Sequence, residues 1–202
     1  MKVLGVSGLP GSGKSLISKI GEKKSINVLK MGDIVREEAE KRKTDTGKTA
    51  IDLRKEHGDF VLAKIIIKKI NDYSNLNKFN KDKLKNKIEN KIETNTNDTL
   101  HDFFIIEGIR SQSEVDLFKK NFDIFRLVSV FSSPDTRFNR LKNRKRKDDS
   151  QNYEEFLKRD YRELNFGIGD VIATSDAIII NENSFNDYKK QVCDFLDNLL
   201  DD

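Results

Sequence analysis

The sequence predicts an α/β protein built on a five-stranded parallel sheet with helices on both faces. Five short apolar runs, each suited to one buried strand, alternate with stretches whose apolar residues recur at helical spacing. The runs are 3–6, 27–29, 103–106, 127–131 and 177–180. Because a parallel pair of strands needs a crossover connection, usually a helix, this alternation favours one parallel sheet.

A glycine-rich loop directly after the first run has the Gly-x-x-x-x-Gly-Lys-Ser pattern of a phosphate-binding P-loop. Its residues are Gly8, Leu9, Pro10, Gly11, Ser12, Gly13, Lys14 and Ser15. Glycines let backbone N–H groups turn toward phosphate oxygens, and the helix that follows adds a partial positive charge. We expect Lys14 to reach the β- and γ-phosphates and Ser15 to bind Mg²⁺. The pattern predicts binding of a nucleoside triphosphate, and we expect this nucleotide to be ATP.

The region after the second run carries candidate ligand contacts. Asp33 is a reasonable N-cap for a helix, and Arg36 lies one turn later, near the strand end where ligands of open α/β sheets bind. Residues 49–57 have a helical pattern that Gly58 breaks, and another helical pattern starts at Asp59.

Residues 71–99 shift in composition to Asn, Lys, Asp and Thr. Such a segment cannot bury enough apolar area to offset its ordering entropy, although Leu84, Ile88 and Ile92 recur every four residues and could extend a helix. We interpret it as a protruding insertion without a role in the chemistry.

The strongest strand signal, 103–106, ends in a carboxylate, Glu107. A carboxylate at the tip of an apolar strand is the second hallmark of a P-loop protein, where it holds Mg²⁺ or its water. Ser111, with Glu114 three residues later, forms a capping box that predicts the start of the next helix.

Residues 137–149 are densely charged, and two interpretations stay open. Charge runs are usually solvated faces. Alternatively, this run is a short lid whose arginines neutralise charge on the transferring phosphoryl group.

The composition argues against several kinds of partner. The 38 basic and 34 acidic residues give a net charge of +4, typical of a mixed, solvated surface rather than a nucleic-acid-binding one. No apolar run approaches the ~20 residues of a membrane helix, and no signal peptide precedes the first run. A single cysteine, Cys193, fits a reducing cytoplasm, and His57 and His101 lack zinc-ligand spacing. We expect a cytoplasmic protein without nucleic-acid or membrane partners; its oligomeric state stays open.

Four segments together resemble the nucleoside monophosphate kinases, adenylate kinase above all: 8–15, 31–36, 107–110 and 146–149. The sequence more closely resembles an archaeal family of uncharacterised P-loop proteins described as adenylate-kinase-related, over nearly the whole chain apart from the 71–99 stretch. The resemblance implies one P-loop kinase domain over residues 1–202. Within it, residues 32–70 would form an acceptor-binding helical lobe, 71–99 the polar insertion and 137–149 a short lid.

The same resemblance implies roles for individual residues. Arg36 matches the arginine of a motif that holds the acceptor phosphate, and Arg110 resembles a second arginine that clamps it. The implied substrate contacts are Gly32, Asp33, Arg36, Val61 and Arg110. The implied catalytic side chains are Lys14, Arg110 and the lid arginine Arg146, and the implied metal contacts are Ser15 and Glu107.

Three functions follow as hypotheses. The first is a kinase that moves the γ-phosphoryl of ATP to a nucleoside monophosphate such as AMP; Arg36 and Arg110 favour it, because a doubly held acceptor implies an anionic group. The second is a kinase with a hydroxyl acceptor such as dephospho-coenzyme A, with Asp33 as general base. Residues 176–181 resemble the last strand of dephospho-coenzyme A kinase. The third is an adenine-nucleotide-binding regulatory protein with little turnover.

Overall fold

The computed structural model describes residues 1–85, 103–144, 149 and 152–201. Five strands form one sheet in the order β2-β3-β1-β4-β5, and every adjacent pair is parallel. They are β1 (Lys2–Ser7), β2 (Asn27–Lys30), β3 (Phe103–Ile109), β4 (Ile124–Phe131) and β5 (Ala177–Ile180). The predicted five-stranded parallel sheet is confirmed, and the strand before the P-loop is central in it.

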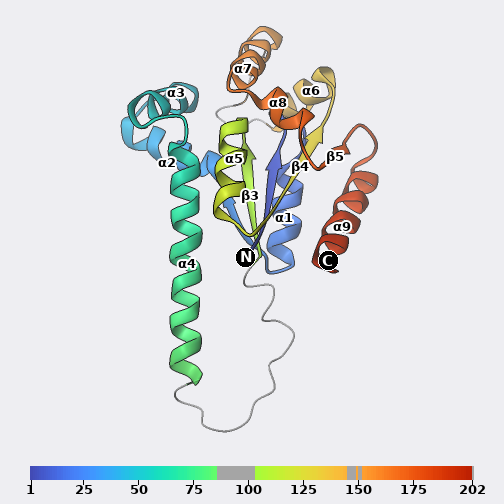
Figure 1. Ribbon diagram of the computed structural model, residues 1–202. Helices are drawn as coiled ribbons and strands as arrows, with labels where there is room; N and C mark the ends of the chain where they lie inside the picture. Colours follow the sequence, from blue (N-terminus) through green and yellow to red (C-terminus); the bar gives the residue numbers. More distant parts are fainter. Residues whose placement is uncertain (86–102, 145–148, 150–151, 202) are drawn as a thin grey trace.

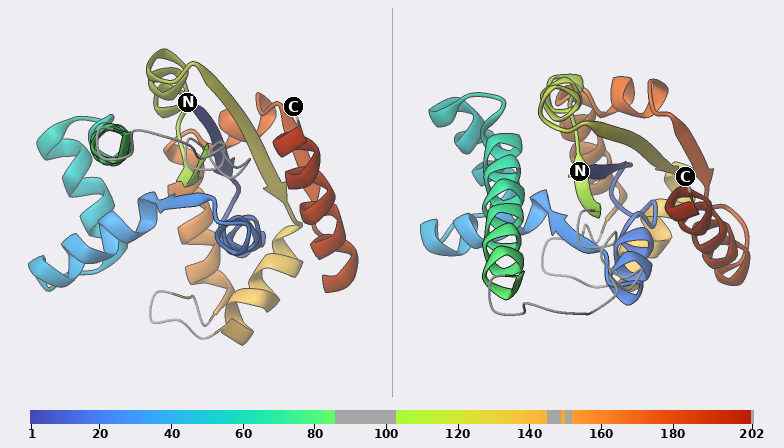
Figure 2. Two further views of the ribbon diagram at one scale, coloured as in Figure 1. Left: turned by 90° about the horizontal axis from the view of Figure 1, so that it is seen from below. Right: turned by 60° about the horizontal axis from the view of Figure 1, so that its bottom comes forward.

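Helices cover both faces of this sheet, as predicted (Figures 1 and 2). α1 and α9 lie on one face, α4, α5 and α8 on the other, while α6 and α7 lie toward the carboxyl ends of the strands and α2 and α3 form a lobe to one side. The helices are α1 (Ser15–Lys23), α2 (Met31–Arg42), α3 (Thr46–His57), α4 (Val61–Lys85), α5 (Gln112–Asn121), α6 (Pro134–Arg144), α7 (Tyr153–Asn165), α8 (Ile168–Ala173) and α9 (Phe185–Asp201).

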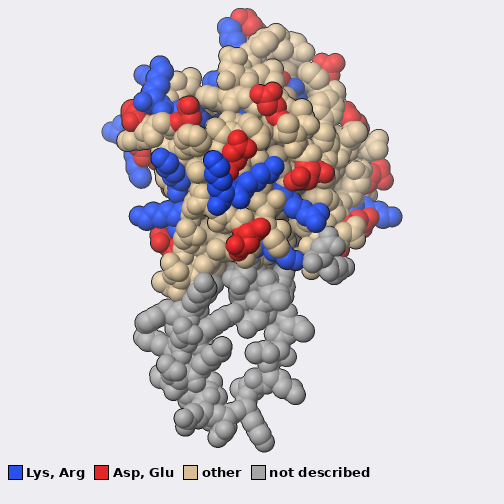
Figure 3. Space-filling view, viewed as in Figure 1, with Lys and Arg blue, Asp and Glu red and all other residues tan. Residues whose placement is uncertain are grey.

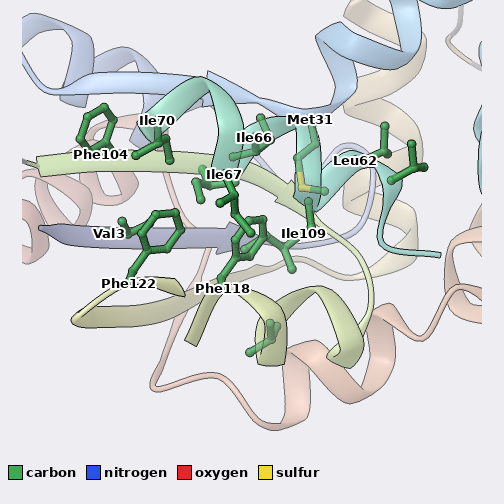
Figure 4. Close-up of a cluster of buried hydrophobic side chains, with 14 of the residues drawn as sticks. Val3, Met31, Leu62, Ile66, Ile67, Ile70, Phe104, Ile109, Phe118 and Phe122 are labelled. Carbon is green, nitrogen blue, oxygen red and sulfur yellow. The ribbon is translucent and has the colours of Figure 1, made fainter. Parts of the chain in front are cut away.

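Two hydrophobic clusters hold these layers together, because successive strand residues point to opposite faces. Figure 4 shows part of the larger cluster, where Met31 of α2 lies with Ile66 of α4, Ile109 of β3 and Phe118 of α5. Met31 is almost completely buried there. The larger cluster therefore fixes the α2–α3 lobe to the sheet edge from which the candidate site is built.

Of three predicted helix starts, the one at Ser111 agrees with the structure, the one at residue 49 is three residues late, and the one at Asp33 is wrong. Ser111 caps α5 by accepting a hydrogen bond from the Glu114 N–H group, and α3 extends the predicted helix by three residues toward its cap, Asp45. Asp33, in contrast, is not an N-cap: β2 ends at Lys30 and α2 begins at the next residue, so that no loop residue is left to cap it. Asp33 lies in the first turn, where its negative charge interacts favourably with the helix dipole.

The expected boundary at Asn71 is absent from the structure, because α4 continues unbroken through Lys85. The Tyr73 ring meets Phe104 edge-on, with 5.7 Å between ring centroids, and Ser74 is buried beside Met1. The first polar residues of this stretch, Asn71, Asp72 and Asn75, therefore lie on the exposed face of a helix whose other face packs on the protein. The remainder of the expected insertion, 86–99, lies outside the described residues.

The surface carries both signs of charge, as expected from the composition. Lys and Arg side chains are interspersed with Asp and Glu on the face shown in Figure 3. In the part of the chain that the structure describes, no helix combines the length and apolar character needed to cross a membrane.

Candidate active site

The P-loop connects β1 to α1 in a conformation that requires its glycines. Gly8, Gly11 and Gly13 have φ angles of 142°, 84° and 102°, which side chains rarely adopt. A β-carbon on Gly11 would also lie 2.7 Å from the carbonyl oxygen of Arg137, and one on Gly13 would collide with the Asn181 side chain. Conformation and packing therefore both exclude larger residues at Gly11 and Gly13.

Side chains from α9 and the end of β5 bind the carbonyl oxygens of this loop. Asn181 Nδ2 donates to the Ser12 carbonyl at 2.8 Å, and Tyr188 Oη donates to the Gly13 carbonyl at 2.9 Å. A phosphate would be repelled by these oxygens, and the two donors reduce their partial negative charge. The Ser12 hydroxyl is buried and has no hydrogen-bond partner among the described residues.

Arg137 supports the loop from α6. Its guanidinium donates to the Pro10 carbonyl at 3.3 Å and makes two bonds, of 2.8 and 2.6 Å, to the Asp160 carboxylate of α7. The Arg137 residue is 2 % exposed. The start of the expected 137–149 lid is therefore a helix packed against the P-loop, and Asp160 compensates the buried charge of Arg137. Arg146, the expected lid arginine, lies outside the described residues.

A cavity of about 260 Å³ opens between the P-loop, the ends of β2 and β3, and helices α2, α3, α6 and α7. It is lined by eight cationic side chains: Lys14, Lys30, Arg36, Arg110, Arg140, Arg144, Arg159 and Arg162. Two carboxylates, Glu107 and Glu163, accompany them. A concave site with this excess of positive charge suits a polyanion such as a nucleotide phosphate chain.

Most of the expected site residues meet at this cavity. Its lining includes Pro10, Gly11, Gly13, Lys14, Ser15, Gly32, Arg36, Glu107 and Arg110. Gly8, Leu9 and Ser12 belong to the P-loop without lining the cavity. Asp33 and Val61 also do not line it; Val61 begins α4 and is buried in the larger hydrophobic cluster. The Val61 side chain is therefore not placed to contact an acceptor in the cavity, because it packs into the hydrophobic core.

The environment of Lys14 destabilises its charge in the absence of a ligand. Burial lowers the pKa of the Lys14 ammonium to about 8; the Glu107 carboxylate opposes the shift and the Arg110 guanidinium adds to it. A bound phosphate chain would supply the missing negative charge and favour protonated Lys14.

β3 has an irregularity directly after Glu107, which lines the cavity. The register between β1 and β3 shifts after Val6 and Glu107, and Gly108, with φ of 101°, is the extra residue of a bulge. Ser18 Oγ of α1 donates to Glu107 Oε2 at 2.5 Å and fixes the carboxylate.

Ser15 and Glu107 supply the oxygen donors that Mg²⁺ prefers. No group of three or more His, Cys, Asp or Glu side chains suited to a metal gathers among the described residues. A Mg²⁺ ion held by Ser15 and Glu107 would therefore complete its shell with phosphate and water oxygens, as Mg²⁺ does at phosphate sites.

Each of the two expected acceptor arginines is paired with a carboxylate. Arg36 donates to Asp33 within α2, and its side chain remains 45 % exposed. Arg110 Nε lies 2.9 Å from Glu163 Oε2, and the Arg110 side chain is 25 % exposed. A phosphate can approach both guanidinium groups from the cavity.

α7 contributes lining residues that the sequence analysis did not identify. Arg159, Arg162 and Glu163 all come from this helix. Their spacing of three and four places them on one helical face, which was the available signal. Lys30 was also not assigned to the site, whereas Arg140 and Arg144 belong to the 137–149 run for which a lid was one of two interpretations.

Comparisons with known proteins identify relatives of this chain and a solved structure with the same fold. A family model described as AAA domain matches residues 7–157. A UPF0200 protein of Methanothermobacter thermautotrophicus is 44% identical over 201 residues, which cover 100% of this chain and 92% of that protein. A UPF0200 protein of Methanocaldococcus jannaschii is 40% identical, covering 99% and 91%. The crystal structure of shikimate kinase from Bacteroides thetaiotaomicron has the same fold, with a TM-score of 0.55 at 14% identity, covering 99% of this chain and 98% of that one.

Proposed function

The chain belongs to the archaeal UPF0200 family and to the AAA-domain family whose model matches it, and we propose that it is a nucleotide kinase. It transfers the γ-phosphoryl group of ATP to the phosphate of a nucleoside monophosphate such as AMP. The observation that carries the proposal is that the P-loop lysine and both expected acceptor arginines line one cavity. Its P-loop kinase-like fold is compatible with this reaction.

The donor side of the reaction is assigned to the P-loop. Lys14, protonated when the triphosphate is bound, neutralises charge that develops on the β- and γ-phosphates. Ser15 and Glu107 would hold Mg²⁺, which supplies further charge neutralisation at the phosphate oxygens. Ser18 keeps the Glu107 carboxylate oriented.

The acceptor side is assigned to Arg36 and Arg110. Arg36 comes from α2 and Arg110 directly follows β3, and both line the cavity together with Gly32 and Gly108. Bonds from two guanidinium groups orient the acceptor phosphate toward the γ-phosphoryl group. Because a phosphate acceptor is already ionised, positioning and charge neutralisation suffice for catalysis.

The arrangement of Asp33 favours this reaction over transfer to a hydroxyl group. Asp33 is ion-paired with Arg36 and does not line the cavity, whereas a general base must reach the proton that it removes. Arg36 and Arg110, in contrast, do line it.

The test is a turnover measurement with a panel of acceptors, followed by phosphorus NMR. ATP and Mg²⁺ are incubated with AMP, other nucleoside monophosphates, adenosine, dephospho-coenzyme A and shikimate. The proposal requires formation of a nucleoside diphosphate from at least one monophosphate, and Lys14→Ala should reduce that rate by orders of magnitude.

Two other outcomes would contradict the proposal. Phosphorylation of a hydroxyl acceptor alone would identify a different kinase. Tight binding of ATP and AMP by calorimetry without turnover of any acceptor would instead identify the regulatory protein.

A further inference from the structure

We propose that Arg54 and Glu114 act as a buried positioning pair that presets Arg110 for the acceptor phosphate and connects it to the α2–α3 lobe. The inference rests on the kinase function proposed above and assigns a role to two residues outside the cavity lining.

The pair joins three segments through one carboxylate. Arg54 Nη2 of α3 lies 3.2 Å from Glu114 Oε1 of α5, and the side chains are 8 % and 0 % exposed. The second oxygen, Glu114 Oε2, accepts a hydrogen bond of 2.8 Å from the backbone N–H of Arg110. A helix of the lobe is thereby connected to the backbone of a cavity residue.

Arg54 also contacts the segment that carries the partner of Arg110. Its guanidinium lies over the Phe166 ring, 4.5 Å from the centroid, and donates to the Ala50 carbonyl at 3.0 Å. Phe166 directly follows α7, whose Glu163 pairs with the Arg110 side chain. Arg54 therefore supports both the backbone of Arg110 and the helix end that holds its guanidinium.

The path of the Glu114 side chain differs from that of a capping box. In a capping box the carboxylate would return to the N–H of the cap residue, Ser111, but here it bonds to the N–H one residue earlier, that of Arg110. Burial raises the pKa of Glu114, so that keeping the carboxylate ionised at this place is unfavourable without Arg54.

A buried ion pair is a poor way to stabilise a core, because apolar residues of similar volume are often at least as stabilising. What an apolar pair cannot do here is accept the Arg110 N–H bond. The benefit of Arg54 and Glu114 is therefore geometric, and the two contributions can be separated by experiment.

The test replaces both members at once, in Arg54→Met/Glu114→Met. This double variant leaves no unpaired buried charge, so that the fold should persist with a melting temperature within a few degrees of the wild type. AMP affinity, measured by calorimetry, should fall tenfold or more, while ATP affinity should change less than twofold. In steady state, KM for AMP should rise by a larger factor than kcat falls.

The matched control is Arg42→Met/Glu56→Met. This pair joins α2 to α3 within the same lobe through two 2.8 Å bonds, but contacts neither Arg110 nor the cavity. Its AMP affinity should equal that of the wild type. If the two double variants bind AMP equally well, Arg54 and Glu114 have only a structural role and the inference is wrong.

A spectroscopic readout keeps this inference distinct from the proposed function. The Arg110 Nε–H group, paired with Glu163, should give a protected arginine side-chain NMR signal in the ligand-free protein. Arg54→Met/Glu114→Met should abolish that protection but spare Arg137, which is bound to Asp160. An unchanged Arg110 signal overturns the positioning pair whether or not the protein proves to be a kinase; absence of kinase turnover in the wild type overturns only the function.

Discussion

Arg137 and Asp160 form a bidentate ion pair between α6 and α7, and this pair lies against the P-loop. The same guanidinium binds the Pro10 carbonyl and stacks 5.0 Å from the centre of the Phe156 ring. One arginine thus joins the loop expected to bind the phosphates to the helix that supplies Glu163 to the cavity.

Removing one member of this pair should destabilise the protein strongly. Asp160→Asn leaves the Arg137 guanidinium buried without a counter-charge, which costs about 3–5 kcal/mol of unfolding free energy. Denaturant unfolding measures this loss. Under conditions where the variant is folded, ATP affinity should fall as well. The Arg137 guanidinium, no longer held by the Asp160 carboxylate, would not keep its hydrogen bond to the Pro10 carbonyl of the P-loop.

The control is the exposed pair of Lys158 and Glu154 on the same helix, whose atoms lie 2.8 Å apart. Glu154→Gln should leave the unfolding midpoint nearly unchanged, since solvent screens exposed pairs. Equal effects of Glu154→Gln and Asp160→Asn would contradict the structural role assigned to Arg137.

ATP affinity should depend on pH through Lys14. The pKa of free Lys14 is about 8, and a bound triphosphate raises it by favouring the charged form. Affinity should therefore be highest below about pH 8 and fall as pH rises above it, approaching tenfold per unit. Calorimetry should also detect proton uptake on binding near pH 8, in buffers of different ionisation enthalpy.

Lys14→Met provides the comparison for this pH dependence. The variant should bind ATP more weakly, and its affinity should be nearly independent of pH over the same range. A pH profile that persists in Lys14→Met would assign the titration to another group.

The features that could be predicted from the sequence depend on neighbouring residues. Gly8 to Ser15 form one contiguous motif, and the central strands β1 and β3 appear as apolar runs because most of their residues are buried. The carboxylate at the tip of β3 was recognisable for the same reason. In the structure β3 continues through Gly108 to Ile109, so that Glu107 lies near the carboxyl end of the strand and not at its last residue.

The missing parts of the site depend on contacts between distant segments. Glu163 lies in a helix full of charges, and only the packing of α7 across the cavity brings it to Arg110. Arg137 belongs to a run of similar cations, and its burial is decided by Asp160, far along the chain. Composition gives the number of charges in such a run but does not indicate which one is buried.

Tyr73 should contribute to stability although it lies in the polar stretch. Tyr73→Ala removes the edge-on contact with Phe104 and should lower the unfolding free energy by about 1–2 kcal/mol, less than a full core deletion because the residue is 40% exposed. Leu76→Ala, at a more exposed position of the same helix, should have a much smaller effect. Equal stabilities of the two variants would show that the helix does not pack on the core at Tyr73.

Arg36→Ala should weaken AMP binding selectively. A charge-assisted contact with a phosphate contributes about 1.5–3 kcal/mol, which corresponds to roughly tenfold to more than a hundredfold in affinity. ATP affinity should change much less, because the P-loop carries that contact. Calorimetry with AMP and adenosine checks both statements; adenosine binding as tightly as AMP would exclude a phosphate clamp.

Asp33→Asn distinguishes the two classes of acceptor. In the ligand-free protein Asp33 holds Arg36, so that an acceptor phosphate has to compete with its carboxylate. With a phosphate acceptor, Asp33→Asn should leave kcat nearly unchanged. KM for AMP should stay the same or decrease, because the competing carboxylate is gone. With a hydroxyl acceptor, the same substitution removes the general base and should reduce kcat by about 10²–10⁴-fold. Glu37→Gln, which removes one charge from an exposed neighbouring position of α2, controls for the change in net charge. A large loss of kcat in Asp33→Asn but not in Glu37→Gln would therefore reject the monophosphate acceptor, because a residue that merely pairs with Arg36 has no proton to transfer.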